Sequence, residues 1–130
     1  MSFVARFAPL FAPLFTLLHA PAQAADHADY EVGASLICDT QAQVERFVTL
    51  FTGDAQAAIQ LVNTEEENPS ACAIMNVAFM RGRQLGMARH GDSAFEIVRI
   101  LVIGVETEGG IRSVRPAVYF SLFGVKEYAV

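Results

Sequence analysis

The sequence predicts an α+β domain in which one or two N-terminal helices pack on a curled antiparallel sheet of about five strands. Apolar residues follow a helical spacing between residues 44 and 62. From Ala71 onward, short apolar stretches alternate with glycine-containing turns, which is typical of antiparallel strands. Closure of this sheet into a small barrel is the alternative arrangement.

The first 24 residues have the three-part pattern of a secretory signal peptide. Arg6 supplies a positive charge, an apolar stretch follows over residues 7–18, and Ala22-Gln23-Ala24 offers a cleavage site between small residues. We therefore expect export by the general secretion route, to the periplasm or as a secreted protein, and a mature chain that begins at Ala25. An uncleaved anchor is the alternative, but a span needs about 20 apolar residues and prolines interrupt this stretch.

The mature chain is predicted to have a flexible acidic tail over residues 25–31 and a single small domain over residues 32–130. Its first element is a short strand over Val32–Ile37. Thr40 and Gln43 then form a capping-box pattern, which starts a helix whose apolar stripe ends at Phe51. Gly53 suits the end of that helix.

Asp54 is suited to cap a second helix over Ala55–Asn63. Four further strands are predicted in the second half of the chain, and Pro116, which has no backbone donor, should start the last of them. These strands are Ala73–Met80, Arg83–Arg89, Ala94–Val105 and Ala117–Phe123. The turns between the first three are Arg81-Gly82 and residues 90–93, and Glu108-Gly109-Gly110 follows the third.

The only two cysteines, Cys38 and Cys72, both fall in the mature chain. Two cysteines in a small exported domain pair more often than they stay free. A bridge between them would close a loop of 35 residues, and the chain-entropy relation gives it a stabilising effect of roughly 3.8 kcal/mol. A redox pair is disfavoured because the two do not form a Cys-x-x-Cys motif.

Charge is unevenly distributed along the mature chain. Residues 25–67 carry a net charge of −8, whereas residues 68–130 carry +2, mostly through arginine. Arg81 and Arg83 could grip an anionic ligand, and strand alternation puts Tyr119 and Phe123 on one face, where they could form a contact patch or a dimer interface. The alternatives are that the arginines pair with the acidic helical half or are solvated, and that the aromatic residues belong to the core.

No catalytic motif is visible, and an enzyme is not expected. His90 and Ser93 lie in one turn, whereas triad partners usually come from separated segments. The net charge of −5 argues against a nucleic-acid partner. No cofactor is predicted.

One metal-binding pattern depends on the cleavage point. A mature chain that begins Ala25-Asp26-His27 resembles the amino-terminal copper- and nickel-binding motif, a free amine with histidine at the third position. The amine, two deprotonated amides and the imidazole could enclose the square plane that Cu(II) and Ni(II) favour.

The sequence thus favours a small, exported, non-catalytic domain that binds a protein, peptide or small ligand in the cell envelope or secreted space, with self-association open. A minor envelope hydrolase without a visible motif is one alternative. Metal capture at the mature N-terminus is the other.

Overall fold

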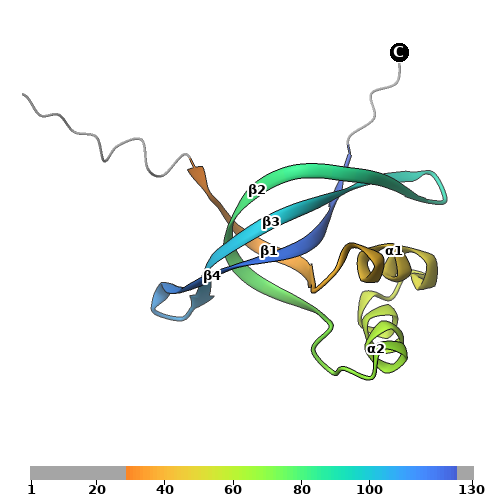
Figure 1. The fold of residues 1–130 in the computed structure, drawn as a ribbon, viewed down its shortest axis with the longest axis horizontal. Helices are drawn as coiled ribbons and strands as arrows, with labels where there is room; N and C mark the ends of the chain where they lie inside the picture. Colours follow the sequence, from red (N-terminus) through yellow and green to blue (C-terminus); the bar gives the residue numbers. More distant parts are fainter. Residues whose placement is uncertain (1–28, 126–130) are drawn as a thin grey trace, which may run out of the picture.

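The computed structural model describes residues 29–125. Their elements are, in chain order, strand β1 (Glu31–Cys38), helices α1 (Gln41–Leu50) and α2 (Ala55–Glu66), and strands β2 (Cys72–His90), β3 (Ser93–Thr107) and β4 (Gly110–Gly124). Both helices pack at one side of a curled antiparallel sheet (Figure 1). The predicted α+β class is confirmed, and the predicted signal peptide, residues 1–24, lies outside the described residues.

The prediction of about five strands is wrong, because the sheet has four. Two of the expected strands form the single long strand β2, and Arg81-Gly82 is not a turn. The register between β2 and β3 shifts on either side of Gln84, which indicates bulges. At Gly82 the chains approach so closely that a Cβ would lie 2.9 Å from the carbonyl oxygen of Arg99. A residue without a side chain is therefore needed at this position, because the backbones of β2 and β3 pack closely together here.

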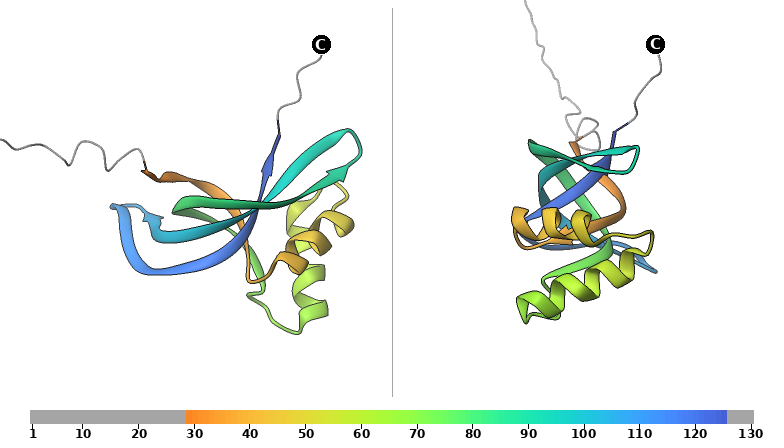
Figure 2. Two further views of the ribbon diagram at one scale, coloured as in Figure 1. Left: turned by 45° about the horizontal axis from the view of Figure 1, so that its top comes forward. Right: turned by 90° about the vertical axis from the view of Figure 1, so that its right-hand side faces the viewer.

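The strand order is β1-β2-β3-β4, and β4 also meets β1. Their pairing consists of one residue pair, Cys38 with Phe120, so the ring of strands closes at a single point. The hairpins β2–β3 and β3–β4 project at opposite ends of the curled sheet (Figure 2). The prediction that Pro116 starts the last strand is wrong, because Pro116 lies within β4. It falls in the stretch of β4 where the register with β3 shifts. A residue without a backbone donor is accommodated there because the ladder is already interrupted.

The helices begin where the sequence predicts. The Thr40 hydroxyl accepts from the backbone N–H of Gln43, and the Gln43 side chain accepts from the backbone N–H of Thr40, which completes the capping box. The Asp54 carboxylate accepts from the backbone N–H of Ala57 and caps α2. The helix ends differ: α1 ends before Phe51, in extended backbone, and α2 continues to Glu66.

Each face of the sheet carries a hydrophobic cluster, which follows from the alternation of the strands. One cluster joins the helices to the sheet through Leu36, Val44, Phe47, Ile59, Val62, Ile97 and their neighbours. A second cluster fills the inner, concave face and consists of Ile37, Val77, Phe79, Val98, Ile100 and Val102. Phe120 and Leu122 pack on the first cluster, whereas Tyr119 and Phe123 pack on the second.

The predicted disulfide is present between Cys38 and Cys72. The two cysteines are direct partners in the β1–β2 register, with Cα atoms 4.1 Å apart, and both are fully buried under the helices. The bridge therefore joins the last residue of β1 to the first residue of β2 and anchors the helical segment between them. Neither helix in residues 29–125 is long and apolar enough to cross a membrane.

Candidate ligand trough

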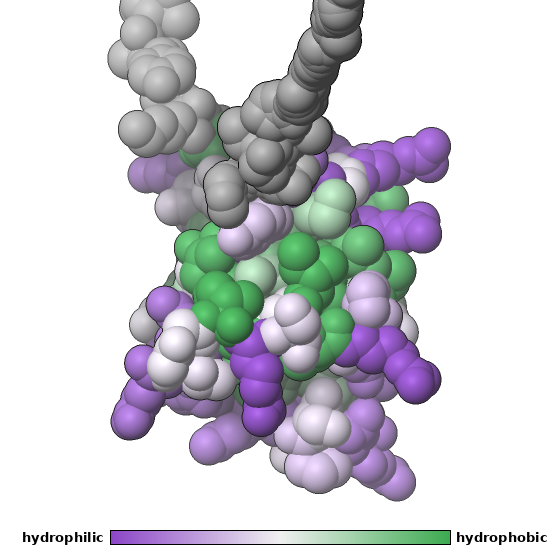
Figure 3. Space-filling view, turned by 90° about the vertical axis from the view of Figure 1, so that its left-hand side faces the viewer, coloured by the Kyte–Doolittle hydropathy of each residue, from purple (hydrophilic) through white to green (hydrophobic). Residues whose placement is uncertain are grey.

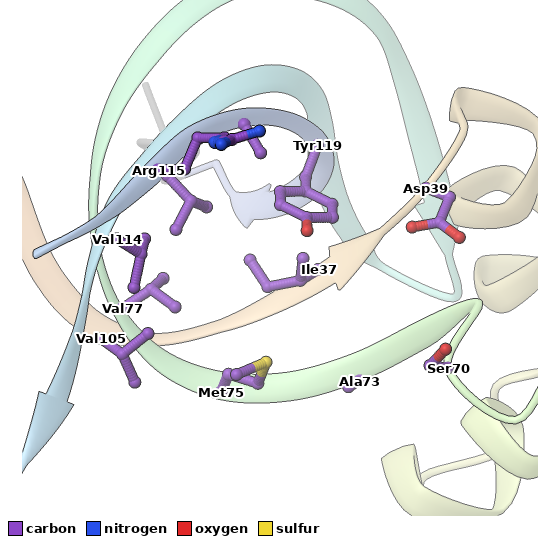
Figure 4. Close-up of a pocket in the computed structure, with 12 residues that line it drawn as sticks. Ile37, Asp39, Ser70, Ala73, Met75, Val77, Val105, Val114, Arg115 and Tyr119 are labelled. Carbon is purple, nitrogen blue, oxygen red and sulfur yellow. The ribbon is translucent and has the colours of Figure 1, made fainter.

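The concave face of the sheet holds a cavity, which we call the trough. It has a volume of about 500 Å³. Side chains from all four strands line it, together with two residues next to the disulfide (Figure 4). The lining residues are Ile37, Asp39, Ser70, Ala73, Met75, Val77, Val102, Val105, Val114, Arg115, Ala117 and Tyr119.

The walls of the trough are mainly aliphatic because the inward-facing positions of each strand are apolar. In β2 these positions are Ala73, Met75 and Val77, at the spacing of two residues that one face of a strand requires. Met75 is 42% exposed, so the trough surface is accessible and is not part of the closed core.

Four polar residues stand among the apolar walls: Asp39, Ser70, Arg115 and Tyr119. Arg115 and Tyr119 come from β4, and the Tyr119 hydroxyl points into the open space of the trough (Figure 4). Asp39, which follows β1, lies across from Arg115 at the other side. Arg115 forms no ion pair with the residues that the structure describes. Its charge is therefore available to an anionic group in the trough.

The opposite end of the concave face is closed by an arginine. The Arg81 guanidinium donates to the Glu31 carboxylate at 2.6 and 3.1 Å. It also lies over the Phe123 ring, 3.8 Å from the centroid, and Phe123 stacks on Phe79 with a centroid separation of 5.7 Å. Charge pairing and a cation–π contact together hold Arg81 in place.

The four residues predicted to bind a ligand are therefore not gathered in one site. Arg81 and Phe123 contact each other at the closed end, and Tyr119 lines the trough. Arg83 lines a second hollow, of about 360 Å³, together with Arg81 and Arg99, so the two predicted arginines do share one hollow. Arg115 and Met75 were not among the predicted ligand-binding residues. For Met75 the available sequence signal was its place among the alternating apolar positions Ala73, Met75 and Val77.

His90 and Ser93, the two residues weighed for catalysis, are direct partners at the β2–β3 turn. His90 lies edge-on to the Phe51 ring, with centroids 5.2 Å apart, and lines a small apolar cavity under α1. Within residues 29–125, no three His, Cys, Asp or Glu side chains lie together in a way that could hold a metal ion. The predicted metal-binding residues Ala25, Asp26 and His27 lie outside the described residues, and that site stays a prediction.

A comparison of the chain with models of known families, with curated proteins and with solved structures found no match.

Proposed function

We propose that the chain is an exported, non-catalytic binding domain whose trough holds a small amphipathic ligand with an apolar body and one anionic group. The observation that carries the proposal is the combination of aliphatic walls with Arg115, a charged side chain that has no ion-pair partner among the described residues. Small-molecule sites have this composition, with a few polar groups in an apolar cleft of about 300–1,000 Å³. The trough volume of about 500 Å³ falls in this range.

The polar groups of the trough indicate where the anionic group of the ligand would bind and where its apolar body would lie. Arg115 offers a planar pair of donors that suits a carboxylate or a phosphate. The Tyr119 hydroxyl can donate to the same anion, because both residues come from β4 and line one wall. The Met75 and Val77 side chains would then cover the apolar body. A carboxylate on an alkyl chain or an aromatic ring meets these requirements.

Export rests on two independent features of the chain. The signal-peptide pattern of residues 1–24 is the first. The second is the Cys38–Cys72 bridge, because disulfides form and persist mainly in oxidising compartments. The periplasm and the secreted space both fit these features.

The first experiment measures binding of 1-anilinonaphthalene-8-sulfonate, a fluorescent probe with an aromatic body and one sulfonate, to the folded, oxidised protein. We expect decanoate to displace the probe and 1-decanol, which has the same chain without the charge, to displace it much more weakly. Arg115→Gln should remove most of the difference between the two competitors. Equal displacement by both in the unmodified protein would contradict the role of Arg115.

The second experiment separates the trough from the rest of the surface. Met75→Asp places a carboxylate among the aliphatic walls, and we expect it to abolish probe binding. Ile74→Asp is the matched control, because Ile74 is also 42% exposed but lies on the opposite face of β2. If both variants fold and bind the probe equally, the ligand site is elsewhere.

A further inference from the structure

A second apolar surface lies on the outer face of the sheet, on the part that the helices leave uncovered. Met80, Leu101 and Val118 are direct partners across β2, β3 and β4, so their side chains form one row. Met80 is 37% exposed and Val118 is 45% exposed. Seen from the side opposite the helices, hydrophobic residues gather in the middle of the surface with hydrophilic residues around them (Figure 3).

Two more residues extend this row toward the β3–β4 hairpin. Val32 pairs with Ala78, and Ala78 pairs with Gly104. A Cβ on Gly104 would lie 2.8 Å from Cγ2 of Ile111, so the Ile111 side chain covers this glycine. Val32 and Ile111 are 45% and 44% exposed. We call Val32, Met80, Leu101, Ile111 and Val118 the open face.

Arginine side chains flank the open face. The hollow of about 360 Å³ is lined by Met80, Leu101 and Val118 and by Arg81, Arg83 and Arg99. Arg81 is already bound to Glu31, but Arg83 and Arg99 form no ion pair with any residue between 29 and 125. Both are exposed, so their charges face solvent beside the apolar row.

Five acidic residues lie on the helices or at their caps: Glu45, Asp54, Glu65, Glu66 and Glu67. The helices lie at one end of the sheet and the β3–β4 hairpin, toward which the open face extends, lies at the other (Figure 1). Glu106, the direct partner of Ile111, is an acidic residue beside the hairpin end of the open face. Arg83 and Arg99 beside the apolar row can attract a negatively charged surface to the middle of the open face.

We propose that the open face docks on the surface of an anionic phospholipid membrane. Aliphatic side chains can enter the boundary between headgroups and acyl chains, and arginine next to them can bind phosphate. Interfaces between proteins draw most of their binding energy from buried aromatic and arginine anchors, and the five residues of the open face include no aromatic. This surface is separate from the trough, so the proposal does not depend on the proposed ligand.

The test uses the full, oxidised mature chain and sedimentation with vesicles of phosphatidylglycerol or of phosphatidylcholine. We expect binding to phosphatidylglycerol only, and weaker binding at high salt. Each arginine near an anionic surface contributes about 1 kcal/mol, so Arg83→Gln with Arg99→Gln should weaken binding on the order of 30-fold. Arg46→Gln is the control, because this arginine lies on α1. Equal binding to both lipids, or the same loss from the control, would overturn the proposal.

A second pair of variants tests the apolar part. Met80→Ser with Val118→Ser should reduce vesicle binding, whereas Met87→Ser should not, although Met87 is 54% exposed. Met75→Asp should also leave vesicle binding unchanged, since it alters only the trough. Circular dichroism verifies that each variant is folded. If the Met80 and Val118 changes instead convert a dimer to a monomer in analytical ultracentrifugation of the protein alone, the open face binds a second copy and the membrane proposal is wrong.

Discussion

The Asn63 side chain holds the backbone of Cys72 from both sides. Its Oδ1 accepts from the Cys72 N–H at 2.8 Å, and its Nδ2 donates to the Cys72 carbonyl at 3.1 Å. The same Nδ2 donates to the Pro69 carbonyl at 2.9 Å. A side chain of α2 thus fixes the first residue of β2, next to the disulfide, and satisfies backbone groups that are partly shielded from water.

Asn63→Ala should destabilise the protein by about 1–3 kcal/mol. The change removes the Asn63 partner of the Cys72 N–H and of the Cys72 and Pro69 carbonyl oxygens. Backbone polar groups without a partner are costly when they are shielded from water. Urea unfolding measures the loss. Thr64→Ala, one position away on the exposed side of α2, is the control and should change the free energy of unfolding much less. A loss of similar size in both variants would mean that helix propensity, and not the contact with Cys72, is responsible.

Removal of the disulfide should have a larger effect than the loss of Asn63. Cys38→Ala with Cys72→Ala should lower the free energy of unfolding by about 3–4 kcal/mol, because the unfolded chain gains the freedom of the loop. Urea unfolding of this variant and of the oxidised protein gives the difference. Native alkylation is an independent measurement: both cysteines should resist it without a reductant. Modification of both in exported protein would show that the bridge does not form there.

Local signals in the sequence predicted the parts of the fold that depend on near neighbours. The capping box at Thr40 and the apolar stripe of α1 need only residues within one or two turns. The disulfide needs only two cysteines and an export signal. The buried residues of α2, Ala58, Ile59 and Val62, also follow from helical spacing, and all three are buried.

The long-range features were not predictable in the same way. Gly82 has the local pattern of a turn, but its role depends on Arg99, which is distant in sequence. The trough depends on register shifts that bring inward positions of four strands together. Bulges of this kind have no local signal, because they are fixed by how β2 bends around the second cluster. The contact between Arg81 and Phe123, which were predicted for two different roles, likewise depends on packing between strands that are distant in sequence.

Ser121, the direct partner of Val98 in the second cluster, offers a test of the packing there. Its hydroxyl is buried and has no hydrogen-bond partner among the described residues. Ser121→Ala removes an unsatisfied polar group and should leave stability unchanged or raise it by about 1 kcal/mol. Thermal unfolding measures this, with the exposed Ser113→Ala on the same strand as a control. A clear loss of stability would mean that the hydroxyl has a partner, such as a bound water.

The ion pair between α1 and α2 should make stability depend on pH. Arg46 donates two hydrogen bonds to the Glu65 carboxylate, each of 2.8 Å, and these lower the pKa of Glu65. A lowered carboxyl pKa contributes stability above the pKa of the unfolded state, and that contribution is lost as pH falls through the folded value. Both side chains are exposed, so the effect should be small and weaker in salt.

The measurement compares the urea midpoints of the unmodified protein and Arg46→Gln between pH 7 and pH 3. The difference should be largest at pH 7 and should shrink as Glu65 is protonated. The Glu65 carboxyl, followed by NMR, should titrate at higher pH in Arg46→Gln and at the same pH as before in Arg83→Gln. A difference in midpoints that grows toward acid would contradict the sign of this linkage.

Substitutions at two glycines of β2 test whether the bulged stretch around Gln84 depends on the close approach of the β2 and β3 backbones. A Cβ at Gly82 would lie 2.9 Å from the Arg99 carbonyl oxygen, whereas a Cβ at Gly86 would have no atom within 4 Å. The contact at Gly82 is with backbone, which cannot move away without shifting β3.

Gly82→Ala should therefore destabilise the protein by about 1–3 kcal/mol, the range found for overpacked positions. Gly86→Ala should be neutral or stabilising, because alanine restricts the unfolded chain more than glycine does. Urea unfolding of both variants gives the comparison, and equal effects would show that β2 and β3 can separate at Gly82 without cost.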